Sequence, residues 1–223
     1  MNLEAYQQVL NELKGYNAKL VAVSKTKPNE AIEAFYNQGQ RIFGESKVQE
    51  LTTKEEALPK DIEWHMIGHL QRNKVKYMAP FVSLVHGVDS ERLLNEIDKQ
   101  AKKSERKIKV LLQMHIAEEE TKFGLDENEL EQLLNDYLGK EEQNLEICGL
   151  MGMATNTDNT SQVAKEFAGL KNLFDELKST TFSGAEHFKE ISMGMSGDYK
   201  IALDQGSTLV RIGSMLFGAR NYV

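Results

Sequence analysis

Short apolar runs alternate along the whole chain with longer polar stretches of helical period. This alternation is typical of strand–helix units, and it constrains the fold more than any other feature of the sequence. We expect strands at residues 20–24, 41–44, 64–67, 83–86, 108–116, 147–153, 191–195 and 209–212. Amphipathic stretches at 90–103, 127–137 and 161–177 predict helices between strands, and residues 3–13 predict a helix before the first strand.

Eight strands with helices between them predict one (β/α)₈ TIM-type barrel with an extra N-terminal helix, a single domain over residues 1–223. A doubly wound sheet is the alternative, because periodicity does not distinguish a closed parallel sheet from an open one. In a barrel, the chemistry belongs at the carboxyl ends of the strands. Reactive side chains are therefore expected just after the apolar runs.

Charge and composition narrow the classes of partner. Lys plus Arg number 27 against 34 Asp plus Glu, so the net charge of −7 disfavours nucleic acid or an anionic membrane as the main partner. No apolar run approaches the ~20 residues that span a bilayer, and the N-terminus lacks a signal-peptide pattern. Cys148, the only cysteine, excludes an intramolecular disulfide and a cysteine-based zinc cluster. We expect a cytoplasmic protein without a metal site.

Lys25 follows the first predicted strand. Strand alternation places Val21, Val23 and Lys25 on one face, so Lys25 points into the barrel mouth if the valines point inward. A lysine partly desolvated there would have a depressed pKa and could form a Schiff base with a carbonyl compound. The alternative is that Lys25 and Lys27 are solvated loop charges, which is the commoner case for a lysine considered alone.

Small residues follow the last two predicted strands, among them Ser196, Gly213 and Ser214. Loops at these places in TIM barrels often bind phosphate through backbone N–H groups. Most Ser-Gly loops are instead helix caps and tight turns. A Schiff-base lysine and a phosphate site on one rim indicate a phosphorylated aldehyde, but they do not distinguish a cofactor from a sugar phosphate.

Several separated motifs resemble one family. They are Val-Ala-Val-Ser-Lys-Thr-Lys-Pro (21–28), Trp-His-Met-Ile-Gly-His-Leu-Gln-Arg-Asn-Lys (64–74), Ser-Met-Gly-Met-Ser (192–196), Gly-Ser-Thr (206–208), Val-Arg-Ile-Gly (210–213) and Phe-Gly-Ala-Arg (217–220). In this order, over residues 20–222, they resemble the pyridoxal phosphate homeostasis proteins, relatives of the N-terminal barrel of alanine racemase.

The resemblance implies that Lys25 holds pyridoxal 5′-phosphate (PLP) as a Schiff base. It also implies that Ser196, Gly213 and Ser214 hold the phosphate. Arg211 would face the pyridine nitrogen, where a guanidinium donates a hydrogen bond but cannot accept one. The ring nitrogen then stays unprotonated, which weakens PLP as an electron sink. Without the resemblance, Arg211 could equally be read as a solvated surface arginine.

One residue departs from the family pattern. The family usually has an asparagine where this chain has Ser46, in Gly-Glu-Ser-Lys-Val-Gln-Glu (44–50). His65 could lie near the cofactor or be a core histidine, whereas His86 is expected to be structural. Lys122 could reach the barrel mouth. Met151 and Met153 are expected to fill the barrel interior.

The resemblance favours PLP binding and homeostasis without turnover. The racemase relatives take a second acid/base tyrosine from an additional domain that residues 1–223 do not include, and Tyr199 and Tyr222 are better explained as packing or rim residues. We expect a monomer whose partners are PLP and PLP-requiring apoenzymes. The alternatives are a PLP-dependent amino-acid racemase of low activity and, less favoured, a class I aldolase acting on a sugar phosphate.

Overall fold

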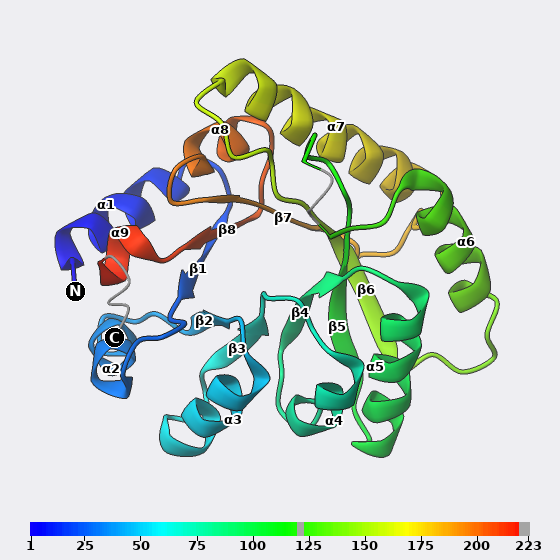
Figure 1. The fold of residues 1–223 in the computed structure, drawn as a ribbon, viewed down its shortest axis with the longest axis horizontal. Helices are drawn as coiled ribbons and strands as arrows, with labels where there is room; N and C mark the ends of the chain where they lie inside the picture. The colour runs from blue at the N-terminus through cyan, green and yellow to red at the C-terminus, as the bar shows by residue number, and fades with distance from the viewer. Residues whose placement is uncertain (120–122, 219–223) are drawn as a thin grey trace.

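The computed structural model describes residues 1–119 and 123–218, and it shows a closed barrel of parallel strands (Figure 1). The strands are β1 (Lys19–Val23), β2 (Ile42–Glu45), β3 (Glu63–Met66), β4 (Leu84–Val88), β5 (Ile108–Gln113), β6 (Leu145–Met151), β7 (Glu190–Met195) and β8 (Leu209–Ile212). Strand β1 pairs with both β2 and β8, where Leu20 lies opposite Val210. The prediction of a (β/α)₈ barrel is confirmed, and this closure excludes the doubly wound sheet.

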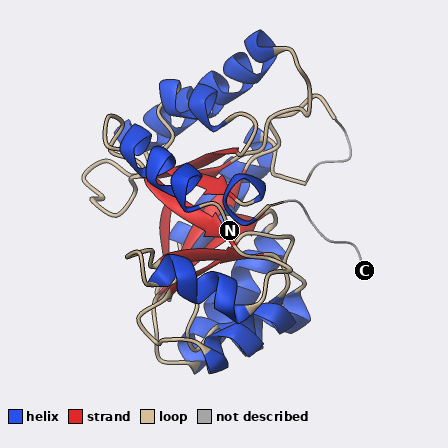
Figure 2. Cartoon of the chain, turned by 90° about the vertical axis from the view of Figure 1, so that its left-hand side faces the viewer, coloured by secondary structure: helices blue, strands red, loops and turns tan. Residues whose placement is uncertain are grey.

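Helices surround the strands on the outside of the barrel (Figure 2). They are α1 (Leu3–Leu13), α2 (Asn29–Tyr36), α3 (Val48–Ala57), α4 (Val75–Met78), α5 (Glu91–Lys103), α6 (Glu127–Leu138), α7 (Thr160–Ser179), α8 (Tyr199–Asp204) and α9 (Ser214–Phe217), with a short 3₁₀ helix at Arg72–Lys74. In the described part of the chain, no helix has the length and apolar character to cross a membrane.

The predicted boundaries differ from the observed ones mainly at β5 and β6. Strand β5 ends at Gln113, three residues before the predicted end, because the chain leaves the sheet and Met114 instead bridges to Leu125. Strand β6 begins at Leu145, two residues before the predicted start, and it ends at Met151. Periodicity locates a strand well, but the last paired residue depends on the neighbouring strand.

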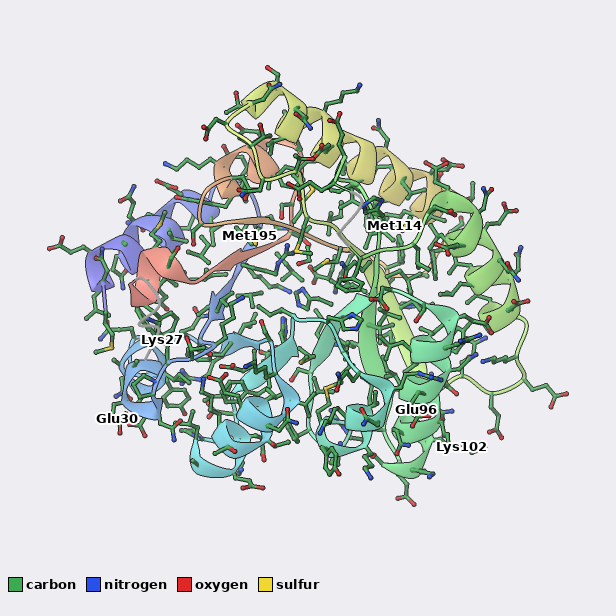
Figure 3. All side chains as sticks on the ribbon, viewed as in Figure 1. Lys27, Glu30, Glu96, Lys102, Met114 and Met195 are labelled. Atoms are coloured by element: carbon green, nitrogen blue, oxygen red, sulfur yellow. The ribbon has the colours of Figure 1, made fainter. Side chains whose placement is uncertain are left out.

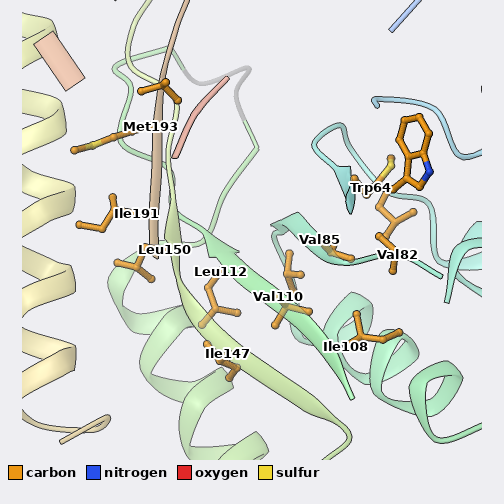
Figure 4. Packing of buried hydrophobic residues seen from close by; sticks show 14 of the residues in the cluster. Trp64, Val82, Val85, Ile108, Val110, Leu112, Ile147, Leu150, Ile191 and Met193 are labelled. Atoms are coloured by element: carbon orange, nitrogen blue, oxygen red, sulfur yellow. The ribbon is translucent and has the colours of Figure 1, made fainter. Parts of the chain in front are cut away.

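The outer faces of the strands pack against the helices. Figure 4 shows Ile191 and Met193 extending from β7 toward the neighbouring helix α7, and both side chains are buried. Val163, Phe167 and Leu170 are buried on α7 at three- and four-residue spacings, as the sequence predicts. Since side chains alternate along a strand, Ser192 between Ile191 and Met193 must point into the barrel.

The inner faces carry a smaller apolar cluster, formed by Val21, Leu84, Leu111, Cys148, Met151 and Leu209. Val21 and Met151 therefore lie in the barrel interior as predicted, and Met153 packs against this cluster while partly exposed.

Candidate functional site

A cavity of about 290 Å³ opens at the carboxyl ends of the strands. It is lined by Val23, Lys25, Lys27, Ser46, Ile67, Met153, Met195, Ser196, Gly197, Arg211, Gly213, Ser214 and Gly218. All five residues that the sequence singles out for ligand binding lie on this one cavity. Its walls combine lysine and arginine, hydroxyl groups and apolar side chains.

The Lys25 backbone is held in an unusual turn directly after β1. The next residue, Thr26, has φ +63°, in the left-handed region that β-branched residues rarely occupy. The Glu50 carboxylate compensates by accepting a hydrogen bond from the Thr26 backbone N–H at 2.6 Å. Strain of this kind persists only where surrounding contacts fix it, and it is concentrated at ligand sites. The turn therefore sets the direction of the half-buried Lys25 side chain.

A buried charged network supports this turn from below. Lys54 Nζ donates to the Ser24 carbonyl at 2.8 Å, to Glu45 Oε1 at 2.8 Å and to Glu50 Oε1 at 2.6 Å. The Ser24 hydroxyl also donates to Glu45 Oε1, at 2.6 Å. Burial raises the pKa of Glu45, while the charge and hydrogen bonds of Lys54 and the bond from Ser24 act against that rise. Lys54 thus connects α3 to Ser24, which precedes Lys25, and through Glu50 to Thr26, which follows it.

The opposite wall brings the ends of β7 and β8 together. Ser196 Oγ accepts a hydrogen bond from the Gly213 backbone N–H at 3.3 Å. A side chain on Gly213 would place its Cβ 3.2 Å from the Val23 carbonyl oxygen, a tight contact that glycine avoids where β8 ends beside β1. The hydroxyls of Ser196 and Ser214 and the backbone of Gly213 therefore line the same side of the cavity.

Lys27 links this cavity to the end of the described chain. Its Nζ donates to the carbonyl oxygens of Phe217 at 3.1 Å and Gly218 at 3.2 Å. Figure 3 places Lys27 beside α9, on the same side of the barrel as Met195. Through these two hydrogen bonds, Lys27 connects the β1–α2 loop to the end of α9.

Arg211 forms part of the cavity floor and is fixed by two hydrogen bonds. One guanidinium nitrogen donates to Ser192 Oγ at 2.5 Å and another donates to the Gly152 carbonyl at 3.2 Å. Burial lowers the pKa of Arg211 to about 10, so the group remains charged at neutral pH. The guanidinium carries five N–H groups, so it keeps donor capacity for a ligand. Its 4% exposure excludes the alternative of a solvated surface arginine.

Two histidines continue the polar chain into the barrel. His86 Nδ1 lies 2.8 Å from Ser192 Oγ, and His86 Nε2 lies 2.9 Å from His65 Nδ1. Burial is the main cause that lowers the pKa of His65 to about 3 and that of His86 well below 6.5, so both rings are neutral at pH 7. His65 is separated from the cavity by His86 and Ser192. Strand alternation predicts that Ser192 and His86 lie on inner faces of the barrel, but it does not predict the contact between them.

Comparisons with known proteins identify the family of this chain. Residues 2–221 match the family described as "Alanine racemase, N-terminal domain". The pyridoxal phosphate homeostasis protein of Aquifex aeolicus (strain VF5) is 42% identical over 206 residues, which cover 92% of this chain and 88% of that protein. The Homo sapiens protein of the same name is 39% identical over 221 residues, which cover 95% of this chain and 80% of that protein. The chain belongs to the pyridoxal phosphate homeostasis protein family.

Solved structures extend the comparison within this family and beyond it. PipY of Synechococcus elongatus PCC7942, solved with PLP bound, has a TM-score of 0.83 and 33% identity, covering 95% of this chain and 99% of PipY. Alanine racemase from Bartonella henselae, solved with covalently bound PLP, has a TM-score of 0.74 at 19% identity and covers 96% of this chain but 57% of the racemase. The latter likeness shows a shared fold.

Tyr199 and His69 lie outside the lining of the cavity. The Tyr199 hydroxyl donates to Glu12 Oε2 at 2.6 Å and thus packs between α8 and α1. His69 contacts Asp89 and stacks on Phe123. Across residues 1–119 and 123–218, no three His, Cys, Asp or Glu side chains are grouped so as to hold a metal. Lys122 and Tyr222 lie outside the described residues.

Proposed function

We propose that this chain binds PLP covalently and reversibly in the cavity at the carboxyl ends of the strands and thereby takes part in PLP homeostasis. The observation that carries the proposal is that Lys25, Arg211 and the phosphate-site residues Ser196, Gly213 and Ser214 all line that cavity. Membership of the family supports the choice of PLP over a sugar phosphate. The PLP bound to PipY, at 33% identity, supports it as well.

The residues present fit this cofactor. Bound PLP supplies an electrophilic aldehyde carbon. Lys25 would hold PLP covalently and reversibly through that carbon. The hydroxyls of Ser196 and Ser214 offer uncharged donors for the phosphate, and the Gly213 N–H donates to Ser196 Oγ beside them. Arg211 is positioned by Ser192 and Gly152 to donate to the pyridine nitrogen.

Binding without turnover is the favoured form of this function. A guanidinium at the pyridine nitrogen keeps that nitrogen unprotonated, which disfavours carbanion chemistry. Tyr199, one candidate for a second acid/base group, is hydrogen-bonded to Glu12 rather than directed into the cavity. These observations disfavour an amino-acid racemase.

The proposal includes three finer points. PLP-requiring apoenzymes are proposed as recipients, because hydrolysis of the lysine link returns the free cofactor. A monomer is proposed, since the closed barrel pairs every strand within one chain. The cytoplasm is proposed as the compartment, because the chain's one cysteine needs no oxidising environment.

The test is chemical labelling of Lys25. Protein incubated with PLP should become yellow and lose that colour on borohydride reduction, and peptide mass mapping should find the phosphopyridoxyl group on Lys25. Lys25→Ala should carry no label at this peptide, whereas Lys47→Ala, an exposed lysine outside the cavity, should label as the unaltered chain does. An unlabelled protein, or a label that persists in Lys25→Ala, would contradict the proposal.

Ser46 gives a second prediction at the same site. Its side chain lines the cavity at the position where the family usually has asparagine. Loss of one hydrogen bond contributes about 0.5–1.5 kcal/mol, so Ser46→Ala should weaken PLP retention by about twofold to tenfold. Ser46→Asn should retain or increase the affinity, because an amide reaches further with both a donor and an acceptor. Equilibrium dialysis followed by absorbance measures both; equal affinity of all three proteins would exclude Ser46 from the site.

A further inference from the structure

A second cavity, of about 650 Å³, lies at the opposite end of the barrel. Its lining includes the first residues of six strands: Lys19 of β1, Ile42 of β2, Glu63 of β3, Leu84 of β4, Glu190 of β7 and Leu209 of β8. This is the amino-terminal mouth, whereas TIM barrels place their chemistry at the other mouth. The proposed PLP function makes no use of this cavity.

His65 forms part of the inner wall of this amino-terminal cavity. The residue is 4% exposed, and its Nδ1 is engaged by His86. Within the described part of the chain, His65 Nε2 has no hydrogen-bond partner, and it is not among the polar atoms sealed from solvent. This nitrogen therefore faces the cavity.

The hydrogen-bond chain favours the tautomer of His65 with its proton on Nε2. Arg211 can only donate, so Ser192 Oγ accepts from it; among the described residues, His86 Nδ1 is the one other hydrogen-bond partner of this buried hydroxyl and so the acceptor within reach of its proton. His86 Nδ1 is that acceptor, which leaves the His86 proton on Nε2, donating to His65 Nδ1. In a neutral ring, the remaining His65 proton then lies on Nε2 and points into the cavity as a donor.

Lysines share the lining of this cavity with His65. Lys19 and Lys109 are the two charged groups that act on His65, and both oppose its protonation. Lys109 lies beside Leu84 in the β4–β5 register, and Leu84 lies beside His65 in the β3–β4 register. Among the described residues Lys109 has no ion-pair partner, whereas Lys19 pairs with Glu190 at 3.1 Å.

Acidic residues are present but partly engaged. Glu63, Glu146, Glu186 and Glu190 also line the cavity. Glu190 accepts from Lys19 and from the Thr208 hydroxyl, and Glu146 accepts from the Cys148 thiol. Glu190 and Glu146 are therefore already engaged by groups of the protein.

We propose that the amino-terminal cavity is a binding site for a small oxyanion, a carboxylate or phosphate group, which accepts a hydrogen bond from His65 Nε2 and pairs with Lys109. The site requires no cofactor at the other mouth, so it is independent of the proposed function. An oxyanion supplies the acceptor that His65 lacks and a counter-charge for Lys109, and charge-assisted hydrogen bonds are among the strongest available to a protein.

Inorganic phosphate is the probe for the test, and the ¹⁵N resonances of His65 are the readout. The protein is first loaded with PLP and reduced with borohydride, so that the proposed PLP cavity is already filled. If loading fails, the double variant Ser196→Ala/Ser214→Ala, which lacks the hydroxyls of the proposed phosphate site, is used in its place. Failure of the proposed function therefore does not affect this test. Phosphate should produce saturable shifts of His65 Nε2, and chloride at equal ionic strength should not. Acetate in place of phosphate distinguishes a carboxylate from a phosphate preference.

Lys109→Gln should weaken phosphate binding about tenfold, because it removes the charged partner. Lys103→Gln, an exposed lysine at the end of α5 outside the cavity, is the matched control and should leave binding unchanged. Both substitutions are at exposed positions, so neither should prevent folding. Absence of a saturable His65 shift with either anion, or equal weakening by the two variants, would overturn the proposal.

Discussion

Lys54→Met is expected to lower the free energy of unfolding by about 3–5 kcal/mol, the usual cost of leaving one member of a buried ion pair without its partner. Glu45 is fully buried, and among residues 1–119 and 123–218 its Oε2 already has no hydrogen-bond partner. Lys54 supplies the charge that balances it, at 2.8 Å. Urea unfolding followed by circular dichroism at pH 7 measures the difference.

Two matched variants separate burial from charge. Lys60→Met breaks the exposed Lys60–Glu55 pair and should change stability by at most about 1 kcal/mol. Glu45→Leu/Lys54→Met removes both buried charges and should recover much of the loss, because apolar replacement of a whole buried pair is often neutral. If Lys54→Met costs no more than Lys60→Met, the buried network does not stabilise the fold.

The same substitution should act on the proposed PLP site. Lys54 holds the Ser24 carbonyl and Glu50, and Glu50 holds the strained Thr26 backbone next to Lys25. Folded Lys54→Met protein should therefore release PLP faster than the unaltered chain, because the Lys25 turn is no longer fixed from below. Unchanged release from the folded variant would mean that the network serves stability alone.

Acidification from pH 7 to pH 5 is expected to cost the fold up to about 4 kcal/mol through His65 and His86, roughly 2 kcal/mol for each ring. The unfolded chain binds protons at histidine near pH 6.5. The folded chain does not, because burial lowers the pKa of His65 to about 3 and that of His86 well below 6.5. The histidine contribution to the free energy of unfolding is therefore present above pH 6.5 and is lost as the pH falls from there toward pH 5.

Urea unfolding at half-unit pH steps provides the measurement. Protonation of Glu45, whose pKa is raised by burial, acts in the opposite direction, so variants are needed to isolate the histidines. His65→Gln should reduce the loss of unfolding free energy between pH 7 and pH 5 by about half of the histidine contribution. This reduction does not depend on how stable the variant is at pH 7. Between pH 7.5 and pH 9 the histidine contribution is constant. A pH slope that is identical in His65→Gln would show that His65 is protonated in the folded state.

The sequence predicted the parts of the site that depend on local order. Lys25 directly follows an apolar run of alternating valines, and alternation along one strand is enough to aim it into the barrel mouth. Ser196 and Gly213 follow later runs, so the barrel hypothesis already placed them on the same rim. The hydrogen bond between them depends on how β7 and β8 end, which periodicity does not contain.

The sequence by itself determined the order of strands and helices and which residues lie at the carboxyl ends, because side-chain periodicity is a local property. Only the tertiary structure decided that β1 closes on β8, that Lys54 reaches Glu45 and Ser24, and that Arg211, Ser192, His86 and His65 form one chain. Those contacts join segments far apart in the chain. Their partners are selected by strand register and barrel closure, which belong to the whole fold rather than to any one segment.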